Sequence, residues 1–240
     1  MVGGQEAVAI GWANPLETSR VVGRPLFWQT SGVTEANRTA PPLPDETELG
    51  ELTDDALTGR FRILQRKRGH RYSVDDLLTA REAMRALEGQ PPPDAYIDLG
   101  CGIGSVLLMV AHHLNEARIV GVEAQALSFG LAERNVERNG LGEQVRLLHG
   151  DLRDPAVHAD ALSDGRFDLV TGTPPYAPPG TSVPSPDSQR CFARVEMRGG
   201  IEDYLAAAAK LVKPTGRVVV CGVANAPERA RTGAAAASLR

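Results

Sequence analysis

Short apolar runs alternate with helical patterns over most of the chain. Apolar residues recur with a helical period near residues 104–114, 125–139 and 201–212. Between these stretches lie runs rich in β-branched residues, which predict strands at residues 95–99, 118–122, 145–148, 167–171 and 217–221. Nearly continuous apolar strands separated by helices are typical of a parallel sheet that is covered on both faces. The pattern therefore predicts a doubly wound, mostly parallel α/β domain over residues 73–223.

A further helix is predicted at the start of this domain. Ser73 and Asp76 have the spacing of a capping box, and apolar residues follow at helical spacing from Leu77 to Leu87. The Gly- and Pro-rich residues 89–93 then end the helix.

The first 72 residues have a different character. Residues 1–44 show no hydrophobic period and predict a loosely ordered extension with at most one short docked segment. Residues 45–72 form a charged segment, with six acids and no base in 41–55 and six bases and no acid in 56–72. The bases either contact the phosphates of a nucleic acid or pair with those acids, and the sequence leaves both interpretations open.

Composition narrows the class of protein. The 240 residues carry a net charge of -4, which excludes a uniformly basic coat for nucleic acid. The 3 cysteines are too scattered for a disulfide framework, which suits a reducing cytosol. No apolar run approaches the roughly 20 residues that span a bilayer, and no secretory signal opens the chain. The histidines lack a Cys or carboxylate cluster at ligand spacing, so no metal site is predicted. We expect a cytoplasmic protein without a membrane segment.

A glycine-rich turn follows the first predicted strand. Glycines at alternate positions let the backbone turn tightly and approach a ligand. The dinucleotide fingerprint G-x-G-x-x-G is excluded, because Ser105 and Leu107 stand where its third small residue would lie. The spacing D-x-G-x-G-x-G instead resembles motif I of the class I S-adenosylmethionine methyltransferases. This resemblance implies a cofactor-binding turn made of Asp98, Gly100, Gly102 and Gly104.

Acidic residues end the next two predicted strands. Glu123 can accept both hydroxyl protons of an adenosine ribose, as acids do in NAD and S-adenosylmethionine sites. Asp151 resembles the methyltransferase residue that accepts a hydrogen bond from the adenine amino group. The chain has no G-K-[ST] motif and no basic residue in the glycine turn, which disfavours a pyrophosphate. The predicted cofactor is therefore S-adenosylmethionine.

The fourth predicted strand runs into a Thr-Pro-Pro-Tyr loop. Two consecutive prolines fix the backbone and leave the carbonyl groups available as acceptors, and the tyrosine offers a flat face. The loop resembles the [N/D/S]-P-P-[Y/F] motif of methyltransferases that act on exocyclic or amide nitrogens. In those enzymes the first side chain and the first proline carbonyl accept hydrogen bonds from the target NH2 group, while the aromatic ring stacks on it. The implied catalytic residues are Thr173, Pro174, Pro175 and Tyr176.

One position of this loop departs from the motif. Residue 173 is Thr where the motif has Asn, Asp or Ser. The threonine hydroxyl can accept one N–H bond, as serine does, but it lacks the reach of an amide. A nitrogen target remains the prediction, with the identity of that target less closely defined.

A wider resemblance indicates the substrate. Residues 64–80, the helix at 131–141 and the Pro-Pro-Tyr loop resemble the bacterial valine-tRNA adenine-N6 methyltransferases, over about residues 60–223. The resemblance implies a tRNA adenine as the substrate, which would stack on the tyrosine of the loop. It also implies that Tyr72, Ser73 and Asp75 face the cofactor, although Ser73 and Asp75 also suit a helix cap and the helix dipole. The candidate contacts to RNA are Arg66, Lys67, Arg68 and Arg71, with Arg190, Arg194 and Arg198 as further ones.

Two alternatives to the tRNA enzyme remain open. Protein glutamine-N5 methyltransferases of the release-factor type share the glycine turn and Pro-Pro-Tyr, but usually carry a helical N-terminal domain that residues 1–60 do not resemble. A non-catalytic S-adenosylmethionine-binding protein that acts through a partner is the second alternative, because of Thr173. An NAD oxidoreductase is disfavoured, since the glycine spacing fails.

The C-terminal end leaves the predicted sheet short. A class I methyltransferase continues after the fifth strand with a helix and a β-hairpin that joins the sheet edge. Residues 224–240 are an Ala/Arg-rich tail with room for at most one helix, so the last two strands are expected to be missing. The strand at 217–221 would then be an exposed hydrophobic edge, suited to dimerisation or aggregation. Either the chain's end is shortened, or residues 1–44 or a partner cover that edge.

Overall fold

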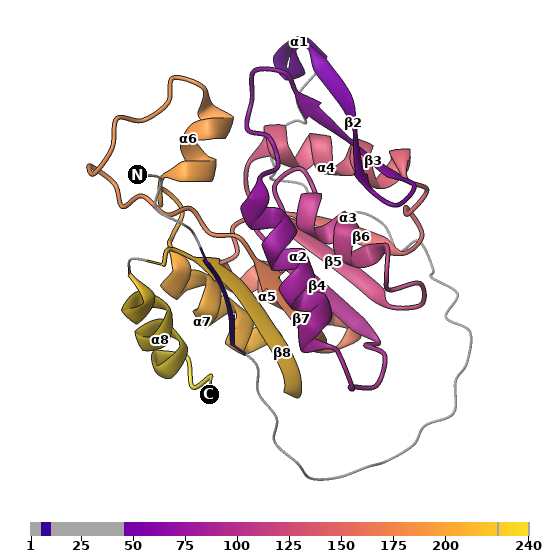
Figure 1. Ribbon diagram of the computed structural model, residues 1–240, viewed down its shortest axis with the longest axis vertical. Coiled ribbons are helices and arrows are strands. Elements are labelled where there is room, and N and C mark those ends of the chain that lie inside the picture. Colours follow the sequence, from indigo (N-terminus) through magenta and orange to yellow (C-terminus); the bar gives the residue numbers. More distant parts are fainter. Residues whose placement is uncertain (1–5, 11–45, 225, 240) are drawn as a thin grey trace.

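The computed structural model describes residues 6–10, 46–224 and 226–239 (Figure 1). Its main feature is a sheet with the strand order β1-β8-β7-β4-β5-β6. All neighbours from β8 to β6 are parallel, while β1 is antiparallel to β8. The strands are β1 (Glu6–Ile10), β4 (Ala95–Leu99), β5 (Arg118–Glu123), β6 (Val145–His149), β7 (Phe167–Gly172) and β8 (Val212–Gly222). The predicted doubly wound parallel sheet is confirmed.

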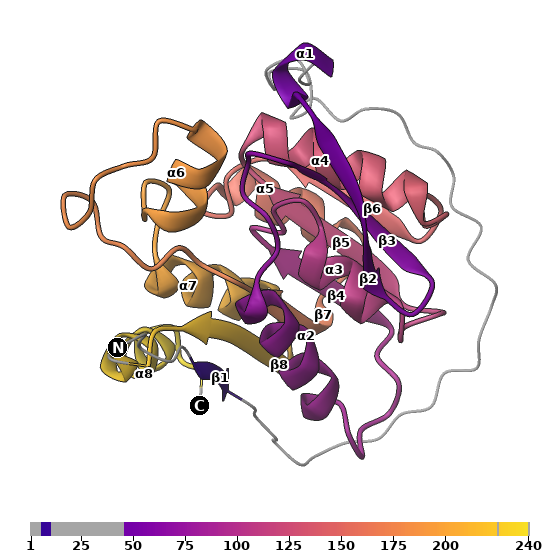
Figure 2. The ribbon, with the colours of Figure 1, turned by 45° about the horizontal axis from the view of Figure 1, so that its top comes forward.

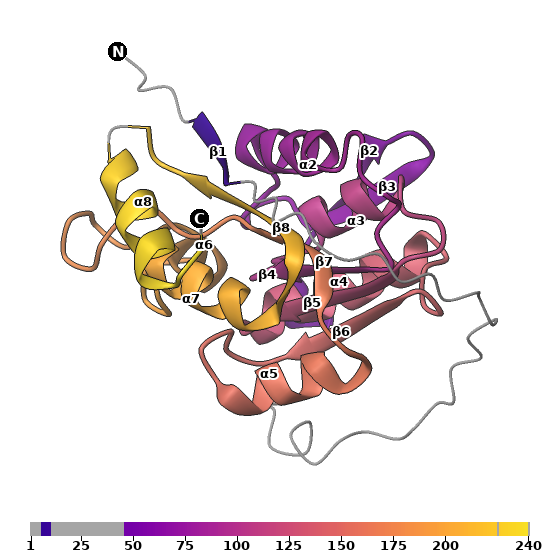
Figure 3. The ribbon, with the colours of Figure 1, turned by 90° about the horizontal axis from the view of Figure 1, so that it is seen from below.

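Helices cover both faces of this sheet (Figure 3). One face packs on α2 (Val74–Ala86), α3 (Ser105–Ala111) and α4 (Ala126–Arg138). The other face packs on α5 (Pro155–Ala161), α7 (Ile201–Leu211) and α8 (Pro227–Ala236). Alternate strand residues supply the two cores: Tyr96 and Leu169 belong to the first, and Ile97 and Val170 to the second. Burial on both faces explains why the strands are apolar without a polar alternation.

The helix predicted from Ser73 is α2. The hydroxyl of Ser73 accepts a hydrogen bond from the backbone N–H of Asp75 at 3.3 Å. The carboxylate of Asp76 accepts one from the backbone N–H of Ser73 at 2.7 Å, which completes the capping box. This cap fixes where the chain enters α2, and hence where residues 70–75 lie beside the sheet.

The edge of the fifth parallel strand is covered by β1. Glu6 pairs with Gly222 and Ile10 with Val218, so the covering strand comes from the first 44 residues. This is one of the three outcomes that the sequence left open. The edge of β8, which was predicted to be exposed and to mediate a dimer, is therefore already paired within the chain.

A two-stranded hairpin precedes α2 and was missed in the sequence. After the short helix α1 (Glu46–Leu49), it consists of β2 (Leu52–Thr58) and β3 (Phe61–Arg66). It lies along α4 (Figure 2), away from the main sheet. Leu49 and Ile63 pack there against Ile103 and Leu131. The described part of the charged segment, residues 46–72, thus packs on the domain.

The C-terminal residues form the single helix α8, which packs on α7. Arg229 of α8 holds two acids of the neighbouring segment, with 2.7 Å contacts to Glu196 and to Glu202. Another helix, α6 (Ser188–Arg194), lies in the long connection after β7. No helix in the described part of the chain is long and apolar enough to cross a membrane.

Candidate functional site

A cavity of about 560 Å³ opens at the carboxyl ends of the parallel strands. Ligands of open α/β sheets bind at this edge, where the strand order reverses, which here is between β4 and β7. All but one of the predicted cofactor and catalytic residues line it. They are Tyr72, Ser73, Asp75, Asp98, Gly100, Gly102, Glu123, Asp151, Thr173, Pro174, Pro175 and Tyr176. The volume falls within the range that is typical of small-molecule sites.

The glycine turn connects β4 to α3 in a left-handed backbone conformation. The φ angles of Gly100, Gly102 and Gly104 are 62°, 57° and 88°, which only glycine adopts without strain. A Cβ atom on Gly102 would meet no atom within 4 Å, because this residue faces the open cavity. Gly104 is the exception among the predicted residues, since it is the N-cap of α3 and does not line the cavity.

Glu123 ends β5 and is held by two backbone groups. Its Oε2 atom accepts a hydrogen bond from the N–H of Gly102 at 2.9 Å, and its Oε1 atom accepts one from the N–H of Gln125 at 2.6 Å. Burial raises the pKa of Glu123, while these N–H groups oppose the rise. The carboxylate is thus fixed against the glycine turn, with lone pairs left for a ligand.

Asp98 lies deeper, near the end of β4. It is 2 % exposed, and its Oδ1 atom accepts a 2.6 Å hydrogen bond from the hydroxyl of Thr171. The hydroxyl of Tyr96 lies 2.8 Å from that of Thr171, so the three side chains form a buried chain across β4 and β7. Burial raises the pKa of Asp98 to about 7.

Asp151 is tied to its neighbour Arg153. The guanidinium reaches both carboxylate oxygens, with contacts of 2.9 and 2.7 Å. Burial works to raise the pKa of Asp151, but Arg153 outweighs it and the pKa is lowered. A carboxylate oxygen has two lone pairs, so Asp151 can still accept from a ligand.

The Thr-Pro-Pro-Tyr loop forms the wall next to the glycine turn. The hydroxyl oxygen of Thr173 is buried and finds no hydrogen-bond partner among the described residues. The hydroxyl of Tyr176 lies 2.9 Å from the Sγ atom of Cys221 at the end of β8, and it also hydrogen-bonds Asp75. Burial and these neighbours raise the pKa of Tyr176, which keeps its hydroxyl protonated. Two contacts at the hydroxyl thus fix the ring of Tyr176. The hydroxyl oxygen of Thr173, in the same loop, remains available as an acceptor.

Comparison with known proteins assigns the fold and the site to a family. Residues 97–196 match the description "Methyltransferase domain". A release factor glutamine methyltransferase of Moorella thermoacetica is 30% identical over 227 residues, which cover 87% of this chain and 74% of that protein. The chain belongs to the class I S-adenosylmethionine-dependent methyltransferases.

Other relatives of this methyltransferase act on RNA. A tRNA1(Val) (adenine(37)-N6)-methyltransferase of Porphyromonas gingivalis is 28% identical over 165 residues, or 67% of this chain. The chain covers only 62% of the length of that relative. A solved S-adenosylmethionine-dependent methyltransferase from Agrobacterium tumefaciens shares the fold, with a TM-score of 0.54 at 18% identity, over 78% of this chain and 59% of that one. The cofactor of the family is S-adenosylmethionine, as predicted.

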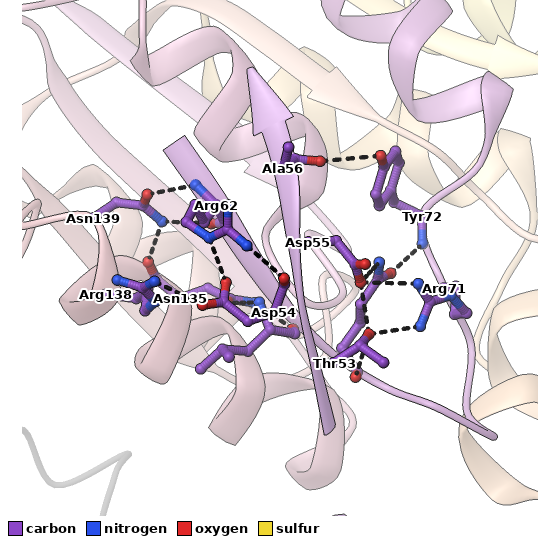
Figure 4. A network of polar contacts seen from close by, with 12 residues as sticks. Thr53, Asp54, Asp55, Ala56, Arg62, Arg71, Tyr72, Asn135, Arg138 and Asn139 are labelled. Carbon is purple, nitrogen blue, oxygen red and sulfur yellow. Dashed lines mark hydrogen bonds and ion pairs between the residues drawn. The ribbon is translucent and has the colours of Figure 1, made fainter. Parts of the chain in front are cut away.

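Ion pairs within the charged segment before α2 involve half of its six bases, and two of these pairs are drawn in Figure 4. Asp54 contacts Arg62 at 2.9 Å and Arg138 at 2.7 Å, and Asp55 contacts Arg71 at 2.9 Å. Among the other predicted RNA contacts, Lys67 pairs with Glu51 at 2.8 Å and Arg66 with Asp187 at 2.9 Å. Three of the six bases, namely Arg62, Lys67 and Arg71, thus pair with acids of the same segment, while Arg66 pairs with an acid outside it. Of the four residues first predicted to contact RNA, Arg68 alone forms no ion pair within the described residues, and its side chain is exposed.

A buried row of polar groups joins α6 to the side of the cavity that lies at the end of β5. The Oε1 atom of Gln189 accepts a 3.0 Å hydrogen bond from the N–H of His70, and its amide nitrogen donates to Ser128 at 3.3 Å. Ser128 in turn donates to the side chain of Gln125 at 2.8 Å, next to Glu123. The segment before α2 and the helix α6 are thereby held together above the cavity.

Several residues that line the cavity were not predicted as cofactor or catalytic residues. Arg194 and Arg198 were expected only as RNA contacts, and both reach the cavity wall. The guanidinium of Arg198 lies 4.4 Å from the ring centroid of Phe192. Tyr204, in the first turn of α7, also lines the cavity, and its only sequence signal is its place just after a predicted helix start. The remaining unpredicted ones include His70, Gln125, Ser128 and Phe192.

Proposed function

We propose that this protein transfers the methyl group of S-adenosylmethionine to a planar nitrogen, namely N6 of an adenine in tRNA. The observation that carries the proposal is the shared cavity of the glycine turn, Glu123 and the Thr-Pro-Pro-Tyr loop. A methyl donor held by the first two elements would have its target held by the third.

The glycine turn, Glu123 and Asp151 are the proposed cofactor-binding residues. Glu123 would accept from the ribose hydroxyls and Asp151 from the adenine amino group, at the ends of neighbouring strands β5 and β6. Gly102 leaves the space into which the cofactor fits, because its Cβ position is open. No base lies in the glycine turn, which suits a ligand without a pyrophosphate.

The bound cofactor supplies a methyl group that its sulfonium already activates. The protein therefore mainly positions the nitrogen and provides polar contacts. The buried hydroxyl oxygen of Thr173 and the carbonyl of Pro174 would accept the two N–H bonds of the target, which directs the nitrogen lone pair towards the methyl group. Tyr176, whose hydroxyl is held by Cys221, would stack on the base.

The entrance to the cavity supports an RNA substrate. Arg190 donates a 3.0 Å hydrogen bond to the carbonyl of Gly69, next to His70. Burial lowers the pKa of His70, and the charges of Arg194 and Arg190 lower it further. Arg194 is exposed at the cavity. Basic groups next to a base-stacking tyrosine suit a phosphate backbone that leads a nucleotide into the site.

A protein glutamine is the second candidate substrate. It is favoured by the release factor glutamine methyltransferase that matches 87% of this chain. The side-chain amide of glutamine is also a planar NH2 group, so Thr173 and Tyr176 would serve it equally.

Transfer of a labelled methyl group separates these candidates. The protein is incubated with S-adenosyl-[methyl-³H]methionine and either bulk tRNA or bulk protein, and the tRNA is then digested to nucleosides. Label in N6-methyladenosine is the expected result, and label in protein alone would favour the glutamine enzyme.

Calorimetry tests the cofactor site separately. Wild-type protein should bind S-adenosylmethionine, and Glu123→Ala should weaken binding by about 10-fold or more, since it removes a charged acceptor. Equal binding by both proteins would contradict the assigned role of Glu123. Binding without any transfer to RNA or protein would favour the non-catalytic alternative.

A further inference from the structure

Tyr204 occupies the crevice where the strand order of the sheet reverses. It belongs to the first turn of α7 and is 6 % exposed. Its ring lies against Gly172, the last residue of β7, and its hydroxyl lies against Gly100 of the glycine turn. The side chain therefore lies between the two strand ends from which the glycine turn and the Thr-Pro-Pro-Tyr loop depart.

Two glycines make room for this side chain. A Cβ atom on Gly100 would collide with the hydroxyl oxygen of Tyr204, and one on Gly172 would lie 2.7 Å from its Cδ1 atom. Gly172 has an ordinary negative φ angle, so its backbone conformation does not require glycine. The need for glycine at residue 172 is explained by the tyrosine ring that passes it.

The hydroxyl of Tyr204 is free of hydrogen bonds to the described residues, since none of them donates a hydrogen bond to it or accepts one from it. Burial, and then the charges of Glu123 and Asp98, raise the pKa of Tyr204, so the hydroxyl keeps its proton and can donate. Unlike the hydroxyl oxygen of Thr173, that of Tyr204 is not fully buried, so it borders the open cavity although the rest of the side chain is enclosed. Since Tyr204 lines the cavity, a bound ligand can supply the missing partner.

The position along the sheet edge identifies the part of the ligand. Glu123 and Asp151, the proposed contacts of the ribose and adenine, end β5 and β6. The sulfonium must lie towards β7, where the Thr-Pro-Pro-Tyr loop presents the target nitrogen. The amino-acid half of S-adenosylmethionine extends beyond the sulfonium, away from the adenosine, and thus reaches the gap between β4 and β7.

We infer that Tyr204 is a cofactor-binding residue whose hydroxyl donates a hydrogen bond to the carboxylate of the amino-acid half of S-adenosylmethionine. This inference rests on the proposed placement of the cofactor. It makes α7 the source of a ligand contact, although the helix lies on the face of the sheet opposite α2 and α3.

Tyr204→Phe and a pair of ligands test the inference. S-adenosylhomocysteine contains the amino-acid half, whereas 5′-methylthioadenosine has the adenosine but lacks that half. Calorimetry should show about 10-fold weaker binding of S-adenosylhomocysteine to Tyr204→Phe than to wild type. Binding of 5′-methylthioadenosine should be unchanged.

Thermal unfolding without ligand distinguishes a contact to the cofactor from a structural role. Tyr204→Phe should keep the wild-type midpoint, because no hydrogen bond within the protein is lost. Tyr96→Phe is the matched control: its hydroxyl bonds Thr171, so its loss should lower the midpoint by about 2–4 °C.

Three results would overturn the inference. They are unchanged binding of both ligands by Tyr204→Phe, equal weakening of both ligands, and a midpoint lowered as in the Tyr96 variant. Failure of wild-type protein to bind S-adenosylhomocysteine would instead refute the cofactor site itself, so the two failures are distinguishable.

Discussion

The buried chain of Tyr96, Thr171 and Asp98 places an ionisable carboxyl group beneath the glycine turn. Asp98 is almost fully buried and accepts a hydrogen bond from the hydroxyl of Thr171 on the neighbouring strand β7. Removing a carboxylate from water without a cation favours the protonated form. This residue at the base of the proposed cofactor site is therefore also a source of pH-dependent stability.

Asp98→Asn should change how stability depends on pH. The folded-state pKa of Asp98, about 7, lies above the value of about 3.9 in an unfolded chain. Its contribution is therefore complete below about pH 4 and is lost as the pH rises through 7. Asparagine does not titrate. Between pH 4 and pH 8, the free energy of unfolding of the wild type should therefore fall by about 2–4 kcal/mol relative to that of the variant. Urea unfolding at several pH values measures this difference, and parallel pH profiles would contradict it.

Tyr176 combines a ring for stacking with a hydroxyl that fixes the ring. Tyr176→Ala should lower kcat/KM for methyl transfer by about 5- to 150-fold, the loss of roughly 1–3 kcal/mol of stacking on the base. Tyr176→Phe keeps the ring and loses only the contacts to Cys221 and Asp75, so it should retain most of the activity. Steady-state kinetics on tRNA compares them, and equal losses in both variants would argue against stacking.

The hairpin β2–β3 is attached to α4 by two asparagines one helical turn apart (Figure 4). Asn135 accepts from the N–H of Leu64 at 2.6 Å and donates to the carbonyl groups of Leu64 and Ile103, each at 2.9 Å. Asn139 accepts from the N–H of Arg62 at 2.9 Å and donates to its carbonyl at 2.8 Å. The side-chain amides thus pair with the edge of β3 much as another strand would.

Asn135→Ala should be more destabilising than Asn139→Ala. Asn135 is 0% exposed, and its loss leaves buried backbone groups of Leu64 and Ile103 without partners. We expect a loss of about 2–4 kcal/mol in the free energy of unfolding, against about 1 kcal/mol for the half-buried Asn139. Denaturant unfolding of the two variants tests this, and equal losses would contradict it.

Local patterns predicted the parallel strands and α2, α3, α4 and α7, but not this hairpin. The buried row of β3 is Phe61, Ile63 and Gln65, so an alternating pattern is present but contains a polar residue. Gln65 is accommodated because its side-chain amide donates to Asp55 at 2.9 Å, a contact that arises only once the hairpin forms. The cavity residues at strand ends were likewise predictable from spacing, whereas Tyr204 and Gln189 reach the site through packing between distant segments.

At the scale of the whole molecule, the first and the last described strands, β1 and β8, pair at one edge of the main sheet. The last parallel strand, β8, is apolar along residues 218–220 and is paired on its outer side with β1. An unpaired edge of this kind would expose a row of backbone donors and acceptors to other molecules. The first described strand thus protects the last one.

Deletion of residues 1–10 should cause concentration-dependent association. The deletion exposes the outer edge of β8, which can then pair with a second copy. Deletion of residues 1–5 keeps β1 and is the matched control, which should behave as the full chain does. Size-exclusion chromatography with light scattering at several concentrations measures the difference. If both truncated proteins keep the mass of the full chain, β1 is not needed to protect the edge.

The pairing of β1 with β8 also sets an order of events during synthesis. Glu6 leaves the ribosome long before its partner Gly222, because nearly all of the described domain lies between them in the sequence. Contacts so distant in sequence form slowly, because the whole intervening chain must be closed into a loop. The strands β4, β5 and β6, whose carboxyl ends border the cavity, can associate long before that point. The edge strand β1 is thus expected to join last, after these parallel strands have folded.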